Sequence, residues 1–148
     1  MPVLAKNKSA FFAYNILERI EAGLVLNGNE TKAVRSGQAN LKGAYIGFDT
    51  KGATLKGANI SKYKFATVEE YNPTRTRRLL LHKKQIDYLR GKSQESGLTI
   101  VPLSLYTKGR RIKLEIGLAK GKKQYDKRAD IKAREHKREK ARALKGEF

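Results

Sequence analysis

The chain has 148 residues, with 33 Lys or Arg against 14 Asp or Glu and a formal net charge of +19 at neutral pH. This length allows about one domain with one modest hydrophobic core, which leaves little room for a second core. Residues 118–148 carry +7 of the charge and the preceding residues carry +12, so the whole molecule has a positive field that favours polyanions, above all nucleic acid.

The composition also argues against membrane insertion and cysteine chemistry. Uncharged apolar runs such as residues 98–105 fall far short of the roughly 20 residues that a membrane-spanning helix needs. The N-terminal stretch MPVLAKNKSAFFAYN lacks the pattern of a secretory signal. Without cysteine there are no disulfides and no thiolate metal sites, which fits a reducing compartment. We therefore expect a cytoplasmic protein that does not enter a membrane.

The first part of the chain predicts a strand followed by a short helix. In residues 13–26 apolar side chains recur at period two, which is typical of a long strand, and Gly23 is the expected position of a bend. Residues 27–37 carry helix signals at both ends, because Asn27 or Asn29 can cap the first turn and a glycine follows the last.

Two β-hairpins are predicted farther along. Residues 45–49 and 53–60 flank a turn in which Gly52 supplies the positive φ that such turns need. Residues 98–106 and 110–119 flank a second turn. In the last arm apolar and polar side chains alternate, which is the clearest sign of a half-buried strand in the sequence.

The segment between the hairpins is less regular. Residues 61–78 predict a loop across the surface, broken by Pro73. Residues 79–81 are too short for periodicity to decide between helix and strand. Residues 83–97 predict a helix, because apolar side chains lie three apart and Gly97 can end it.

These patterns amount to about five or six strands and two short helices, with turns that suit antiparallel pairing. Sheets this small would leave open edges, so closure into a small barrel is the expected solution. No internal repeat and no Gly/Ser or Pro linker divides the chain. We predict a mainly β fold, a small closed antiparallel β-barrel with flanking short helices over residues 1–120, followed by a basic C-terminal tail, residues 121–148.

Nothing in the sequence predicts an active site or a cofactor. His82 and His136 have no neighbouring histidine and the chain has no cysteine, so a metal site built from those residues is not expected. Glu69 and Glu70 have no second acid that the sequence places across a cleft. The glycines match no phosphate-binding loop. Electrostatic and stacking chemistry remains, because seven tyrosines lie among Lys and Arg residues and can offer ring faces to unstacked bases.

Six stretches, in order along the chain, match one known family. They are KNKSAFFAYNI (6–16), EAGLVLNGNETKAVRSG (21–37), GANISKY (57–63), NPTRTRRLLLHKKQIDYL (72–89), GLTIVPLSLY (97–106) and LAKGKKQYDKR (118–128). The chain resembles the SmpB family, the tmRNA-binding proteins of ribosome rescue. The resemblance implies an OB-type barrel with helices on its flank, in agreement with the strand pattern.

The resemblance also implies a role without enzymatic activity. Members of this family bind the tRNA-like domain of tmRNA and are delivered with elongation factor Tu to ribosomes stalled without a codon in the A site. Translation then switches to the reading frame of tmRNA. We expect this chain to do the same, as a monomer that needs no cofactor.

Candidate RNA-binding residues come from two sources. The resemblance places Asn7, Glu21 and Leu81 in a cluster needed for tmRNA binding. For Glu21, a salt bridge that holds the barrel is an equally good explanation, because a carboxylate orients a nearby Arg or Asn more naturally than it meets phosphate. Charge placement adds Lys8, Lys32, Arg35, Arg75, Arg77 and Arg78.

The tail opens with the family motif G-K-K-x-[H/Y]-D-K-R, present here as Gly121, Lys122, Lys123, Gln124, Tyr125, Asp126, Lys127 and Arg128. The resemblance implies that this segment lies in the decoding centre of the small ribosomal subunit, while the rest of the tail enters the empty mRNA channel as a helix. Tyr125 stands where many relatives have His, which favours stacking over proton transfer. Tyr125 has no core to join, whereas Tyr14 fits a core position.

We expect the free tail, residues 121–148, to be disordered. Favourable ion pairs such as Asp130 with Arg134 contribute only about 0.2–0.5 kcal/mol each. Ordering the backbone costs roughly 1–2 kcal/mol per residue, and Ile131 and Leu144 bury too little surface to offset that cost. In an RNA-walled channel, phosphates would screen the repulsion between Lys and Arg side chains and favour a helix.

Three other classes of protein explain part of the sequence. A basic structural protein of the ribosome that binds rRNA explains the charge and the tail equally well. A promiscuous single-strand binder explains the barrel. An RNA-modifying enzyme explains the affinity for RNA but needs a catalytic constellation, for which the sequence gives no pattern.

Overall fold

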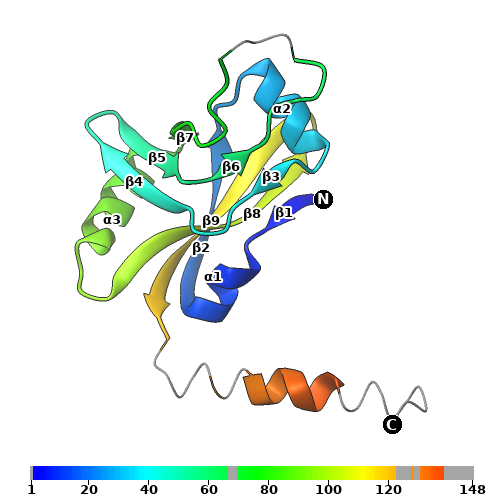
Figure 1. Ribbon diagram of the computed structural model, residues 1–148. Coiled ribbons are helices and arrows are strands. Elements are labelled where there is room, and N and C mark those ends of the chain that lie inside the picture. Colours follow the sequence, from blue (N-terminus) through cyan, green and yellow to red (C-terminus); the bar gives the residue numbers. More distant parts are fainter. Residues whose placement is uncertain (1, 67–69, 123–127, 129–130, 139–148) are drawn as a thin grey trace.

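The computed structural model describes residues 2–66, 70–122, 128 and 131–138 and shows a curved antiparallel sheet with helices around it (Figure 1). Residues 131–138 form a further helix beyond the body. The strands of the body are β1 (Val3–Lys6), β2 (Tyr14–Leu24), β3 (Ala39–Asn40), β4 (Tyr45–Asp49), β5 (Gly52–Lys56), β6 (Asn59–Ile60), β7 (Arg77–Leu80), β8 (Leu98–Lys108) and β9 (Arg111–Gly121). Its helices are α1 (Lys8–Ala13), α2 (Gly28–Arg35) and α3 (Lys83–Ser93).

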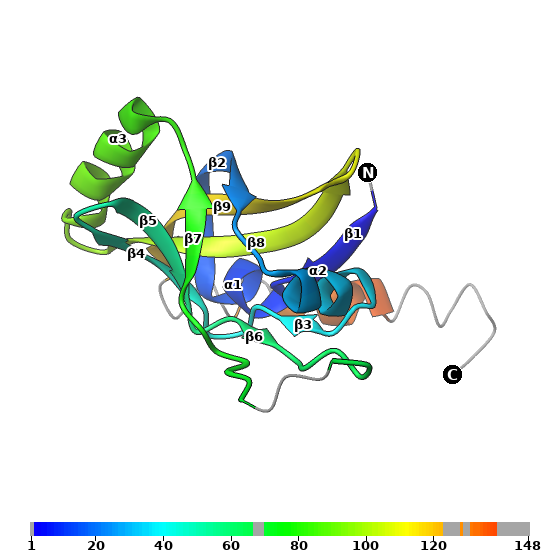
Figure 2. The same ribbon diagram turned by 90° about the horizontal axis from the view of Figure 1, so that it is seen from above.

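Seven strands form one sheet in the order β1-β8-β9-β2-β7-β5-β4, and β3 pairs with β6 in a separate two-stranded ribbon. Within the described residues the edge strands β1 and β4 do not pair with each other, so the predicted closed barrel is wrong. Both edges are short, with four and five residues, and short edge strands are one way in which sheets avoid further pairing. The β3–β6 ribbon lies beside β1 and adds Ile60 to the core without closing the ladder (Figure 2).

The main hydrophobic core lies against the sheet. The predicted alternation in β9 is confirmed, because Ile112, Leu114, Ile116 and Leu118 are all buried there. A smaller cluster lies at α1 and consists of Ala10, Val101, Leu103 and Ala119.

Most predicted elements are confirmed within a few residues. The strand expected over residues 13–26 is β2, and the helix expected over 27–37 is α2, in which Asn27 and Glu30 form a capping box. The second hairpin is β8 with β9, and α3 lies within 83–97. Of residues 79–81, whose structure the sequence left open, the first two belong to strand β7, which ends at Leu80.

Differences from the sequence prediction have local causes. The second arm of the first hairpin ends at Lys56, because Gly57, with a φ of +78°, turns the chain before β6. Helix α1 was not predicted, because its six residues are too few for a periodic signal. Helix α3 ends at Ser93, ahead of the glycine that was expected to end it.

The chain leaves the sheet at Gly121, where the predicted tail begins. Residues 131–138 are helical and all are exposed, and the disorder of the free tail stays a prediction. None of the helices in the described part of the chain is long and apolar enough to span a membrane.

Gly117→Ala should destabilise the fold. Gly117 lies inside β9, where an added Cβ would be 2.9 Å from Leu103 Cδ1 and 3.1 Å from Ile16 Cγ2. Leu103 is fully buried and has little room to move, so we expect the free energy of unfolding, measured by urea denaturation, to fall by about 1–3 kcal/mol. Gly121→Ala is the matched control in the same strand: nothing lies within 4 Å of its added Cβ, and the change should stay below about 0.5 kcal/mol. Equal losses in both variants would contradict the packing explanation.

Candidate nucleic-acid interface

A buried ion pair joins α2 to the start of β7. Arg77 has 0% of its surface exposed, and its Nε donates to Glu30 Oε2 at 2.7 Å. Arg75 Nη2 donates to Glu30 Oε1 at 2.5 Å. Arg77 also donates to the backbone carbonyls of Ala58 and Pro73, at 2.9 and 3.1 Å. Burial acts to raise the pKa of Glu30, but the hydrogen bonds from the two arginines and the α2 N-cap amide outweigh it and hold this pKa below its ordinary value.

The three arginines predicted to bind RNA near β7 have different surroundings. The guanidinium of Arg77 is out of contact with solvent, so the structure gives Arg77 a structural position and not an RNA-facing one. Arg75 keeps 43% of its side chain exposed and still has a surface to offer to phosphate. Arg78 donates through two nitrogens to the two carboxylate oxygens of Asp49, both at 2.8 Å, and this pair holds the pKa of Asp49 well below its usual range.

The predicted cations of α2 are both exposed. Arg35 Nη2 donates to the backbone carbonyl of Arg110 at 2.6 Å, which ties α2 to the turn between β8 and β9. Lys32 Nζ lies 5.6 Å from the ring centroid of Tyr63. One face of α2 is therefore basic, while Ala33 and Val34 are buried on the other.

Glu21 and Leu81 line one shallow pocket, about 380 Å³ in volume, together with His82, Arg111 and Lys113. Leu81 is half-buried against the core, and Glu21 is an exposed residue of β2. The pocket therefore combines an apolar wall with cations at its edge.

The carboxylate of Glu21 is also held from within the protein. Tyr106 Oη donates to Glu21 Oε2 at 2.5 Å, and Lys108 Nζ donates to Oε1 at 3.3 Å. The Tyr106 hydrogen bond is the main reason why the pKa of Glu21 is lowered, and Lys108 adds to it. Burial and the contact with Glu21 raise the pKa of Tyr106. A structural role for Glu21 is supported by its bonds to Tyr106 and Lys108, and a role in RNA binding is supported by its place in the lining of a surface pocket.

Asn7 lies apart from that pocket. It is 4% exposed, and its Oδ1 accepts hydrogen bonds from Ser9 Oγ at 3.0 Å and from the Ala10 amide at 3.3 Å. Its Nδ2 donates to the carbonyl of Pro102 at 2.8 Å. Strands β8 and β9 separate the end of β1, where Asn7 follows, from β2, which carries Glu21. The three residues that the resemblance groups therefore lie at two separate sites, Glu21 and Leu81 at one and Asn7 at the other.

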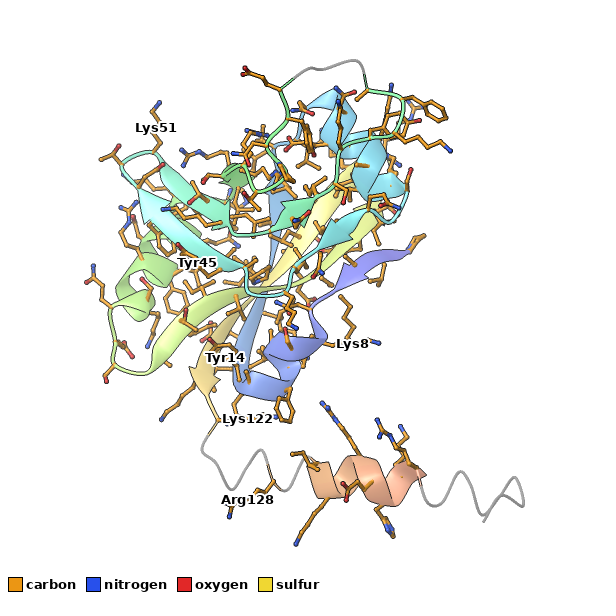
Figure 3. The ribbon with its side chains drawn as sticks, viewed as in Figure 1. Lys8, Tyr14, Tyr45, Lys51, Lys122 and Arg128 are labelled. Carbon is orange, nitrogen blue, oxygen red and sulfur yellow. The ribbon has the colours of Figure 1, made fainter. Side chains whose placement is uncertain are left out.

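Asn7 lines a second pocket, about 530 Å³ in volume, with Tyr14, Tyr45 and Lys42. Figure 3 shows the two tyrosines at the face of the molecule that carries this pocket. Tyr14 is half-buried and packs against the cluster at α1, in keeping with its expected core position, whereas Tyr45 is 50% exposed. The pocket can offer ring edges and one ammonium group to a ligand.

A third basic surface surrounds α1. Lys8 is exposed and lines a hollow with Phe12, Arg134 and Lys137, in which Arg134 Cζ lies 5.2 Å from the Phe12 ring centroid. Figure 3 shows Lys8 near α1, Lys122 where β9 ends and Arg128 farther along the tail.

The tail motif is described only in part. Gly121 ends β9, the Lys122 amide donates to the Ala13 carbonyl at 3.0 Å, and Arg128 is exposed. The other motif residues lie outside the described residues: Lys123, Gln124, Tyr125, Asp126 and Lys127.

Sequence reasoning missed several residues of both pockets. Arg111 and Lys113 had a detectable signal, because they alternate with buried residues of β9 and must face outward. Lys42 had none, since the fold brings the segment before β4 beside α1, and Tyr45 was expected only as one of the seven tyrosines that can offer ring faces. Among the described residues no group of His, Asp or Glu could hold a metal ion. The surface offers cations, ring faces and shallow hollows, which suit a nucleic acid.

Comparison with known proteins identifies the family. A family model described as SmpB protein matches residues 4–146. The chain belongs to the SmpB family. The SsrA-binding protein of Persephonella marina is 46% identical over 146 residues, covering 99% of this chain and 96% of the relative. That of Bacillus cereus (strain ATCC 10987) is 49% identical over 143 residues, covering 97% and 92%.

The fold agrees with the same family. A solved structure described as "tmRNA-SmpB: a journey to the center of the bacterial ribosome" contains a chain that is 39% identical, with a TM-score of 0.70. The similarity covers 84% of this chain and 87% of that chain. Because the SmpB family model extends to residue 146, the basic tail is part of what the family shares.

Glu30→Gln should destabilise this SmpB-family protein by about 3–5 kcal/mol, because it leaves the buried Arg77 guanidinium without its carboxylate. Urea denaturation at pH 7 measures the loss. The control is Asp49→Asn, which breaks an ion pair whose partners are both partly exposed and should cost less than about 1 kcal/mol. Similar losses in the two variants would contradict the importance of burial.

The stability that Glu30 contributes should depend on pH, and the sign follows from its lowered pKa. The folded pKa of Glu30 lies below its ordinary value of 4.5, so its contribution to stability is fully present above that pH and is lost as the pH falls through the folded pKa. Glu30→Gln should remove the part of the stability loss that the wild type shows as the pH falls below 4.5 and through the folded pKa of Glu30. If Glu30→Gln leaves the pH dependence of the free energy of unfolding unchanged, Glu30 does not contribute to the acid sensitivity of the fold.

Proposed function

We propose that this protein binds tmRNA and acts in trans-translation, the rescue of stalled ribosomes. The observation that carries the proposal is the SmpB-family match over residues 4–146, which takes in both the sheet and the tail. The relatives named above are SsrA-binding proteins, and the similar solved chain belongs to a structure described by tmRNA-SmpB and the bacterial ribosome. A net charge of +19 suits an RNA partner.

The body, residues 1–120, binds the tRNA-like domain of tmRNA in this proposal. At the first pocket, Leu81 offers an apolar wall, and Glu21 fixes Lys108 while Arg111 and Lys113 face the incoming phosphates. At the second pocket, Asn7 acts by position: it caps α1 and ties it to β8, which sets the shape of the hollow. The exposed cations that complete the surface are Lys8, Lys32, Arg35 and Arg75, with the partly exposed Arg78 beside them, while Arg77 is left out because it is buried.

The tail, residues 121–148, forms a second functional part. We propose that its motif from Gly121 to Arg128 lies in the decoding centre and that the remainder lies in the vacant mRNA channel. Every residue of the helix at 131–138 is exposed and four of them are Lys or Arg, an arrangement that suits a passage walled by phosphates on all sides. Where mRNA already lies in the channel, the tail has no room, so an empty channel is sensed by exclusion.

The remaining parts of the proposal concern how the protein works. It acts without catalysing a reaction and is delivered to the A site together with elongation factor Tu. It works as a monomer in the cytoplasm, where its RNA partners are.

Truncation after Lys122 should separate RNA binding from rescue. The cut keeps β9 and the hydrogen bond from the Lys122 amide to Ala13, so the body retains its fold. We expect affinity for the tRNA-like domain to stay within about threefold and peptide tagging on stalled ribosomes to be lost. Normal tagging by the truncated protein would contradict a working tail. Preference of the full chain for bulk rRNA over tmRNA would instead favour a structural ribosomal protein.

Tyr125→Ala should reduce tagging more than Gln124→Ala, because only the tyrosine offers a ring for stacking. We expect Tyr125→Phe to retain tagging, since it keeps the ring and loses only the hydroxyl. Tagging yields on the same stalled ribosomes measure all three variants. Equal effects of the two alanine variants would remove the stacking argument.

A further inference from the structure

Phe65 is the most exposed large apolar side chain in the described part of the chain, with 69% of its surface open to solvent. It lies in the loop after β6 and meets Tyr63 edge to face, with 5.5 Å between the ring centroids and 69° between the ring planes. Tyr63 is half-buried and packs against the main core. Tyr63 thus anchors the loop, and Phe65 presents its ring outward.

Cations surround this pair of rings. Lys64 Nζ lies 5.0 Å from the Phe65 ring centroid, and Lys32 Nζ lies 5.6 Å from that of Tyr63. Lys62, in the same loop, is exposed as well. An open ring among flexible ammonium groups is the arrangement with which proteins hold unpaired bases, because the ring stacks on the base and the cations meet the flanking phosphates.

Among the residues that the structure describes, the acids near this place are either neutralised or part of another hollow. The acid of α2, Glu30, is 1% exposed and is neutralised by Arg75 and Arg77. Glu70, farther along the loop, is exposed but lines a separate hollow with Tyr71. The charge around the rings therefore favours an anionic ligand, and the exposed ring face favours one that carries unpaired bases.

The basic surface continues from these rings to the pocket of Glu21 and Leu81. Lys32 lies one helical turn before Arg35, and Arg35 is bonded to the backbone of Arg110. Arg111, the next residue, lines the Glu21–Leu81 pocket. In Figure 1, α2 lies at the opposite end of the body from the C-terminal helix. An RNA bound at the pocket can reach the rings along this track without involving the tail.

We propose that Phe65, supported by Tyr63 and flanked by Lys32, Lys62 and Lys64, is a stacking platform for an unpaired base of the tRNA-like domain of tmRNA. The proposal rests on the proposed function and adds a contact at the α2 end of the body. The base stacks on the open face of Phe65, and the three ammonium groups neutralise the phosphates on either side of it.

Affinity for the isolated tRNA-like domain tests the platform. Phe65→Ala should weaken binding by about tenfold or more, and Phe65→Leu should weaken it similarly, because leucine keeps an apolar group but lacks a ring face. Phe65→Trp should bind like the wild type. Val3→Ala is the control, since Val3 is also exposed, at 61%, and should leave the affinity unchanged. A thermal melt of each variant confirms folding, which an exposed side chain should not affect.

A fluorescence measurement reports on stacking directly. The chain contains no tryptophan, so Phe65→Trp introduces a single indole at the platform. We expect the tRNA-like domain to quench its emission, and the truncation after Lys122 to leave that quenching intact. Absence of quenching at saturating RNA would overturn the proposal.

The outcomes distinguish the platform from the function on which it rests. Wild-type affinity in Phe65→Ala, or in Phe65→Leu, would overturn the stacking platform while tmRNA binding by the wild type stands. Failure of the wild type to bind the tRNA-like domain would overturn both. Normal tmRNA affinity combined with weaker ribosome binding in Phe65→Ala would assign the ring to rRNA and also overturn the proposal.

Discussion

The position of α2 against the sheet depends on the buried pair of Glu30 and Arg77. The guanidinium of Arg77 donates hydrogen bonds to three acceptors in different segments. They are the Glu30 carboxylate of α2, the Ala58 carbonyl between β5 and β6, and the Pro73 carbonyl ahead of β7. A charge of this kind is tolerated in an apolar interior only when it is both paired and hydrogen-bonded. The pair therefore fixes where α2 lies relative to β7, and with it the basic face of α2 and the strand that leads to Leu81.

The role of Arg77 shows what charge counting misses. Among Arg75, Arg77 and Arg78, composition gives three equal candidates for phosphate contact. The alternation of a strand separates them, because Arg77 and Leu79 face the core while Arg78 and Leu80 face outward. The sequence pattern contained this information, but recognising it required β7 to begin at Arg77 and not at Leu79. A short strand with two arginines at its start has no apolar alternation to reveal it.

Local signals predicted the long elements well and the global closure poorly. Strand β9, helix α2 and the two hairpin turns follow from alternation, capping and glycine, all of which act within about ten residues. Closure of the sheet depends instead on whether β1 and β4 meet, which no local pattern encodes. The same limit applies to the site. Glu21 and Leu81 share a pocket because β2 and β7 pair at Gly23 and Leu80, while Asn7 follows β1, which β8 and β9 separate from β2.

The cations of the body and those of residues 131–138 differ in how they are held. In the body, several cations are oriented by acids or carbonyls, as Arg75 is by Glu30, Arg78 by Asp49 and Lys108 by Glu21. Cations held in this way lose less side-chain entropy when RNA arrives, which favours recognition of one fixed shape. The described tail residues 131–138 are exposed throughout, an arrangement that depends on the surroundings to supply order. In the function proposed above, binding energy from the body would be gained on free tmRNA, whereas that of the tail would be gained only where phosphates already form a channel.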